Sequence, residues 1–151
     1  MSLQEELKAL KERIAELENH AKEEQGFPQD GDNYWYINPL GVVLREEWLG
    51  FVSERYMIEI GNVFKTEQDA HFAVEKLKVE AELRKFSRPF ADGEENNHIK
   101  YSPSFDELSV LTSFSYQEQG VFYFESEEKA KQAIEAVGEE CIKKYIFGVE
   151  G

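Results

Sequence analysis

The stretch FKTEQDAHFAVEKL, residues 64–77, returns in altered form as FESEEKAKQAIEAV, residues 124–137. The matched positions are an aromatic residue, a hydroxyl residue suited to a helix N-cap, and apolar residues at helical spacing: Phe64 with Phe124, Thr66 with Ser126, Ala70 with Ala130, Ala73 with Ala133, Val74 with Ile134, and Leu77 with Val137. Candidate catalytic side chains do not recur, since His71 corresponds to Lys131 and Asp69 to Lys129. The repeat therefore predicts a duplicated scaffold rather than a paired active site.

The rest of the chain extends this scaffold into an α+β fold, expected over residues 32–149. We predict two β-β-β-α units of antiparallel strands, residues 32–86 and 98–147, with an acidic loop at 87–97 between them. The expected strands are 34–37, 41–48 and 55–64 in the first unit, and 98–102, 107–116 and 119–124 in the second. The expected helices are 66–86 and 126–146, and residues 49–54 are expected to form a loop.

A helix is expected at the N-terminus, over residues 1–25, because apolar residues alternate at spacings of four and three: Leu3, Leu7, Leu10, Ile14, Leu17 and Ala21. This is the heptad pattern of a coiled coil. In a parallel pair, Glu6 would face Lys11 of a second copy, and Arg13 would face Glu18. The pattern favours a homo-oligomer held by Leu7, Leu10, Ile14 and Leu17 over a helix folded along its own domain.

The two units differ most in their first strands. Alternation places Trp35 and Ile37 on one face of the first strand, and Tyr34 and Tyr36 on the other. Tyr34 and Tyr36 are the candidate contact residues for an unknown protein partner. The competing interpretation, which we favour, is that this face is covered by the N-terminal helix or by the other unit, because a sheet must bury one side.

Composition limits the partners. The chain has 31 acidic and 17 basic residues, a net charge of −14, which disfavours direct binding to nucleic acid or to an anionic membrane surface. No apolar run approaches the roughly 18 residues of a membrane span. We expect a cytoplasmic protein.

The sequence contains no recognisable motif for catalysis, metal binding or cofactor binding. The three histidines, His20, His71 and His98, are isolated, and the glycines form no phosphate-binding loop. The single cysteine, Cys141, falls on the apolar stripe of the second helix, which predicts a buried small side chain rather than a nucleophile. The sequence therefore predicts no catalytic residue, metal or cofactor, and no enzyme activity.

Several segments carry a resemblance to a known group of proteins: YWYI at 34–37, Gly41 and Trp48, GNVFKTEQDAHFAVEKL at 61–77, and FYFESEEKAKQAIEAVGEECIKKYIFGV at 122–149. Over residues 32–149 the chain resembles small uncharacterised proteins encoded by phages and prophages of Gram-positive bacteria. The resemblance implies a phage accessory protein in the cytoplasm of a bacterial host. Two functions stay open: a self-associating protein-interaction module, and an acidic mimic of nucleic acid that inhibits a host DNA-binding or defence protein.

Overall fold

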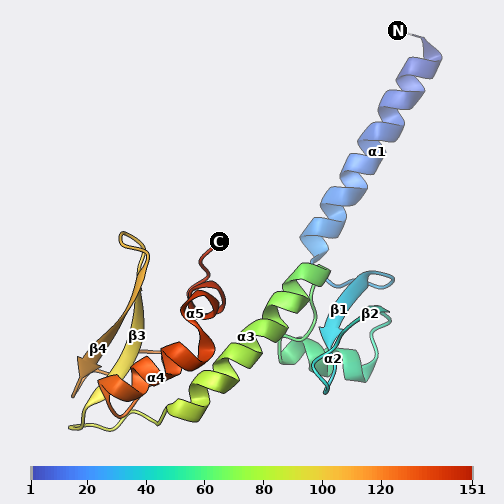
Figure 1. The fold of residues 1–151 in the computed structure, drawn as a ribbon. Coiled ribbons are helices and arrows are strands. Elements are labelled where there is room, and N and C mark those ends of the chain that lie inside the picture. Colours follow the sequence, from blue (N-terminus) through green and yellow to red (C-terminus); the bar gives the residue numbers. More distant parts are fainter. Residues whose placement is uncertain (1, 151) are drawn as a thin grey trace. The chain divides into compact units, whose positions relative to one another are not determined.

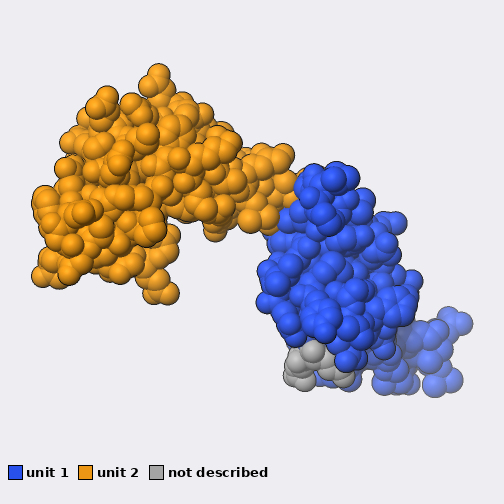
Figure 2. Space-filling model, turned by 90° about the horizontal axis from the view of Figure 1, so that it is seen from below, with its two compact units in different colours: residues 1–70 blue, residues 71–151 orange. Residues whose placement is uncertain are grey.

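The chain forms an α+β structure with two small antiparallel sheets (Figure 1). The structure is a computed structural model that describes residues 2–150, with the side chains of all of them except residues 22–25. In chain order the elements are α1 (Leu3–Gln25), β1 (Asn33–Ile37), β2 (Val43–Glu47), α2 (Val52–Glu59), α3 (Glu67–Phe86), β3 (Asn96–Ser102), β4 (Glu107–Ser113), α4 (Glu127–Val137) and α5 (Glu139–Tyr145). The chain divides within α3 into two compact units, residues 1–70 and 71–151 (Figure 2). Within the described residues, no helix is both long enough and apolar enough to cross a membrane.

The first unit contains the hairpin of β1 and β2. The strands pair antiparallel from Asn33 opposite Glu47 to Ile37 opposite Val43. The Asn38 side chain shapes the turn, because its Oδ1 accepts hydrogen bonds from the backbone N–H groups of Leu40 and Val42, each at 2.9 Å. Gly41 completes the turn at a φ of 79°, a conformation that glycine adopts without strain. The hairpin predicted from the sequence is confirmed.

Residues 49–64 differ from the prediction of a loop followed by a strand. Residues 52–59 form the helix α2 instead. Glu54 starts this helix, because its Oε1 accepts hydrogen bonds from the backbone N–H groups of Leu49 and Phe51 at 3.1 and 2.9 Å. Satisfying free N–H groups at a helix start stabilises the first turn.

The second unit is built on the hairpin of β3 and β4, which pair antiparallel from Asn96 opposite Ser113 to Ser102 opposite Glu107. α4 packs against both strands (Figure 1). The buried core joins residues of α3, α4, α5 and the segment before α4: Val79, Leu83, Phe124, Ala130, Ala133 and Ile142. The core thus lies between the hairpin and the helices, as expected for an α+β unit.

The two related stretches make closely similar local contacts. Phe64 exchanges both backbone hydrogen bonds with Trp35, and Phe124 does so with Asn97, in each case at 3.0 and 2.8 Å. Asp69 N–H donates to Thr66 Oγ1 at 3.1 Å, and Lys129 N–H donates to Ser126 Oγ at 3.0 Å, so both predicted N-caps are present. Ala70 and Ala130 are both fully buried.

The predicted third strand of each unit is wrong. In place of a strand, Phe64 makes one isolated bridge to Trp35, while Tyr123 and Phe124 make isolated bridges to Arg88 and Asn97. In the first unit the Asn62 side chain makes the two hydrogen bonds to Ile37 that the backbone of a third strand would otherwise make. Its Oδ1 accepts from Ile37 N–H at 2.8 Å, and its Nδ2 donates to Ile37 O at 2.7 Å. A side-chain amide can satisfy a strand edge without continuing the ladder.

The predicted single helix 126–146 is divided into α4 and α5 at Gly138. This residue has a φ of 100° and a ψ of 130°, outside the helical region. The break changes which residues of α5 face the core. Ile142 and Lys143 are buried, whereas Cys141 is exposed, which corrects the prediction of a buried cysteine.

Candidate functional site

The α1 helix carries an apolar stripe that the first unit leaves exposed. The heptad residues are each more than half exposed: Leu3 by 84%, Leu7 by 53%, Leu10 by 61%, Ile14 by 55% and Leu17 by 51%. The helix begins with a reciprocal cap, in which Glu5 N–H donates to Ser2 Oγ at 3.2 Å and Ser2 N–H donates to Glu5 Oε2 at 3.0 Å. The cap stabilises the helix itself, while the described part of the chain leaves its leucines at least half exposed to water.

The predicted contact residues Tyr34 and Tyr36 have different environments. Tyr34 is 1% exposed, and its ring contacts Trp48 edge-on, with ring centroids 5.7 Å apart. Tyr36 is half-buried, and its ring centroid lies 5.9 Å from that of Tyr34. The face is covered in part by α2, through a hydrogen bond between Tyr34 and Glu54, so the sequence-based interpretation missed the covering element.

Glu54 is the most deeply buried carboxylate of this face, with 4% of its surface exposed. Burial raises the pKa of Glu54, but hydrogen bonds from the Tyr34 hydroxyl and from backbone N–H groups outweigh burial and lower it. The pKa of Tyr34 is raised, first by burial and then by the hydrogen bond and negative charge of Glu54. The pair therefore holds an ionised carboxylate and a neutral phenol at neutral pH.

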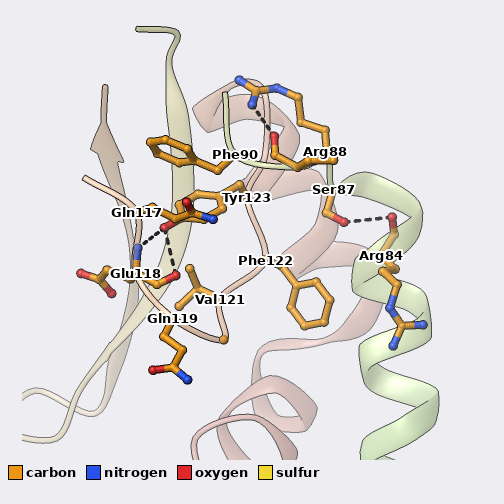
Figure 3. Close-up of a pocket in the computed structure, with 12 residues that line it drawn as sticks. Arg84, Ser87, Arg88, Phe90, Gln117, Glu118, Gln119, Val121, Phe122 and Tyr123 are labelled. Atoms are coloured by element: carbon orange, nitrogen blue, oxygen red, sulfur yellow. Dashed lines mark hydrogen bonds between the residues drawn. The ribbon is translucent and has the colours of Figure 1, made fainter. Parts of the chain in front are cut away.

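The second unit contains a pocket of about 790 Å³ between the end of α3 with its following loop and residues 117–123 (Figure 3). Several of its polar groups form hydrogen bonds with one another. Glu118 N–H donates to Tyr123 Oη at 2.5 Å, and Ser87 Oγ donates to Arg84 O at 3.0 Å. Arg84 lies over the ring of Phe122, 5.9 Å from its centroid. These contacts hold the loops in place.

Arg88 also lines this pocket, yet its guanidinium forms hydrogen bonds with the loop that leads to β3 and with the start of β3. It donates to Asn96 Oδ1 at 2.9 Å, to Pro89 O at 3.0 Å and to Glu95 O. The side-chain amide of Asn96, fully buried, donates back to Ala91 O at 2.8 Å. This use of the donors argues against an anion-binding role for Arg88, because an anion would compete with these hydrogen bonds.

The structure brings His98 close to Glu118, a pairing with no signal in the sequence. His98 Nε2 lies 3.5 Å from Glu118 Oε2, and the imidazole meets the ring of Tyr123 edge-on at 6.0 Å. His98 is 5% exposed, and neither of its ring nitrogens has a hydrogen bond within the described part of the chain. A histidine beside a carboxylate can transfer protons, but no nucleophile accompanies this pair in the contacts described.

Lys143 forms a buried ionic contact in the second unit. Its Nζ donates to Asp106 O at 2.7 Å and lies within 3.3–3.6 Å of the carboxylates of Asp106, Glu139 and Glu140. Burial lowers the pKa of Lys143, but the hydrogen bond to Glu139 and the nearby carboxylates raise it overall. These contacts fasten α5 to the β3–β4 turn, which is a structural role.

Comparison with known proteins adds no relative. No protein-family model matches the chain, and neither a curated protein nor a solved structure matches it at a significant level. Among the side chains that the structure describes, no group of three or more His, Cys, Asp and Glu residues is placed to hold a metal ion. Two surfaces are candidates for function, namely the α1 stripe and the tyrosine face of the first unit.

Proposed function

We propose that this protein is a non-enzymatic interaction module that self-associates through α1. The observation that carries the proposal is the exposed stripe of Leu3, Leu7, Leu10, Ile14 and Leu17 along one helix. An apolar stripe of this kind is stabilised when a second helix covers it. The resemblance to phage and prophage proteins adds the proposal that the module is a phage accessory protein acting in a bacterial cytoplasm.

A second copy of α1 is the partner that fits this stripe. Leu7 and Ile14 occupy a positions of the heptad, and Leu10 and Leu17 occupy d positions. In a parallel pair the flanking charges attract across the seam, Glu6 to Lys11 and Arg13 to Glu18. In the single chain Arg13 instead pairs with Glu16 of its own helix, at 3.1 Å and with both side chains exposed, a contact that is easily exchanged.

A partner surface on the first unit completes the proposed module. The exposed apolar residues lie on α2 and just before it: Leu49, Phe51, Val52 and Tyr56, from 56% to 64% exposed. Tyr36 borders the same region through the hollow that it lines with Leu49 and Phe51. Exposed apolar groups beside half-buried aromatic rings are typical of protein-binding surfaces.

Light scattering of the purified chain tests the self-association. We expect a mass of twice the 17.6 kDa chain at tens of micromolar, and a monomer after Leu10→Asp with Ile14→Asp. The matched control is Ala9→Asp with Ala15→Asp, which adds the same two charges outside the apolar stripe and is expected to leave the dimer intact. A monomeric wild type at these concentrations would refute the proposal.

A further inference from the structure

The tyrosine face of the first unit is hollowed where α2 lies against the hairpin. The hollow has a volume of about 390 Å³. One wall comes from β1 and β2, through Tyr34, Tyr36, Glu46 and Glu47, and the other comes from α2 and the loop before it, through Leu49, Phe51, Ser53, Glu54 and Met57. This space is large enough for one long side chain of another protein.

Every charged residue that lines the hollow is a carboxylate. Glu46 and Glu47 are exposed, whereas Glu54 is buried and accepts hydrogen bonds from Tyr34 and from backbone N–H groups. Within the described residues, none of the three forms an ion pair with a lysine, arginine or histidine. Glu54 and Glu46 both raise the pKa of Tyr34 through their charge, so the hollow has a negative potential. Such a site repels anions and attracts cations.

The rim of the hollow is apolar. Leu49 is 56% exposed and Phe51 is 60% exposed. Tyr36 adds a half-buried aromatic ring. Lysine and arginine carry a charged group on a long apolar stem, which packs well against such side chains, and an aromatic face attracts the cation itself.

We propose that this hollow binds a lysine or arginine side chain of a partner protein, with apolar neighbours of that residue packing on Leu49 and Phe51. The inference rests on the proposed interaction function and names the chemistry of the partner. A neutral segment would leave the carboxylates without a counter-charge, and an acidic segment would be repelled. The partner segment is therefore basic and apolar together.

Nuclear magnetic resonance titration of the isotope-labelled full chain tests the inference. The probes are the peptide N-acetyl-Leu-Arg-Leu-amide and its neutral counterpart, in which citrulline replaces arginine. We expect saturable shifts of the backbone signals of Tyr36, Glu46, Glu47 and Phe51 with the arginine peptide, and no saturable shifts with the citrulline peptide.

Charge variants separate a local site from general attraction to a protein of net charge −14. Glu46→Gln with Glu47→Gln is expected to weaken binding of the arginine peptide by about tenfold, since each exposed ion pair contributes modestly. The control Glu59→Gln removes an exposed charge of α2 that does not line the hollow, and is expected to leave the affinity unchanged. Equal binding of the citrulline peptide, unchanged affinity in the double variant, or equal weakening by Glu59→Gln would each overturn the inference.

Light scattering of the same samples keeps the two proposals apart. A dimer that does not bind the arginine peptide overturns the role of the hollow and leaves self-association intact. A monomer that binds the peptide at these residues overturns self-association and supports the hollow as a binding site.

Discussion

The hydroxyl group of Tyr34 hydrogen-bonds to the carboxylate of Glu54, and both side chains are buried, with 1% and 4% of their surfaces exposed. The contact joins β1 to α2. It allows a charged carboxylate to remain in the interior of the first unit, because hydrogen bonds replace the water that burial removes.

Replacing Tyr34 with Phe should lower the free energy of unfolding of the first unit by about 1.5–3 kcal/mol, since the buried Glu54 loses a hydrogen bond to a charged group. Urea unfolding followed by tryptophan fluorescence measures this unit alone, because both tryptophans, Trp35 and Trp48, belong to it. Tyr36→Phe is the matched control and should change stability by less than about 0.5 kcal/mol. Equal losses in the two variants would argue against the Tyr34–Glu54 contact.

The lowered pKa of Glu54 makes the stability of the first unit depend on pH. Its pKa is lower in the folded state than in the unfolded state, where the pKa of a glutamate is about 4.3. The ionised carboxylate therefore contributes stability above that pH, and this contribution is lost as the pH falls through the folded-state pKa. The difference in unfolding free energy between wild type and Glu54→Gln should stay constant near neutral pH and shrink below about pH 4.5. A difference that grows on acidification would contradict the assigned shift.

Phe124 and Phe64 occupy matched positions but differ in burial, since Phe124 is fully buried and Phe64 only partly. Phe124→Ala should destabilise the second unit by about 3–5 kcal/mol through loss of packing in the core. Phe64→Ala should cost the first unit about 1–2 kcal/mol. Thermal unfolding by circular dichroism, together with tryptophan fluorescence for the first unit, gives both values. A larger loss of stability for Phe64→Ala than for Phe124→Ala would contradict the difference in burial.

The direction of pairing in α1 can be tested by exchanging charges. In a parallel dimer Lys11→Glu would oppose Glu6 of the second copy at two symmetric contacts, each of about 0.2–1 kcal/mol, and should raise the dissociation constant by about tenfold. Adding Glu6→Lys should restore the affinity, because the attraction returns with its sign reversed. Sedimentation equilibrium measures both steps. An antiparallel pair would show no such rescue.

Asn97 and His98 are neighbouring buried residues with opposite hydrogen-bonding states. Asn97 Oδ1 accepts from Thr112 Oγ1 at 2.7 Å, and its Nδ2 donates to Glu95 Oε1 at 3.1 Å, whereas the nitrogens of His98 have no hydrogen bond within the described residues. Asn97→Leu should destabilise the second unit by about 1–3 kcal/mol, since the hydrogen bonds of its buried amide to Thr112, Glu95 and Phe124 O are lost. His98→Leu should cost less than about 0.5 kcal/mol or stabilise the unit, as thermal unfolding would show. A larger cost for His98→Leu would indicate that its imidazole has an essential contact.

Local signals in the sequence were sufficient for several elements. The turn at Asn38–Gly41 predicted the first hairpin, because asparagine and glycine satisfy the turn within a few residues. Thr66 and Ser126 predicted the starts of α3 and α4, because an N-cap acts on an N–H group three residues away. The heptad spacing predicted α1 for the same reason, since a helix repeats over short distances.

The missed elements depend on contacts between distant residues. A strand was predicted at residues 55–64, yet Glu54 starts a helix there with support from Tyr34, twenty positions earlier. In the first unit the predicted third strand is reduced to the single bridge of Phe64 to Trp35, because the Asn62 side chain already satisfies the backbone of Ile37. The sequence around Gly138 does not indicate whether the helix continues through this glycine or ends there.

The sequence by itself determined the heptad stripe, the helix caps, the hairpin turn and the excess of acidic charge, all of which depend on residue type and short spacing. Only the tertiary structure decided that Glu46, Glu47 and Glu54 share one hollow with Tyr36, and that Tyr34 forms its interior wall. These residues come from two strands and a helix. Their distances are set by how the helix packs on the hairpin, and packing depends on the shapes and hydrogen bonds of side chains far apart in the chain.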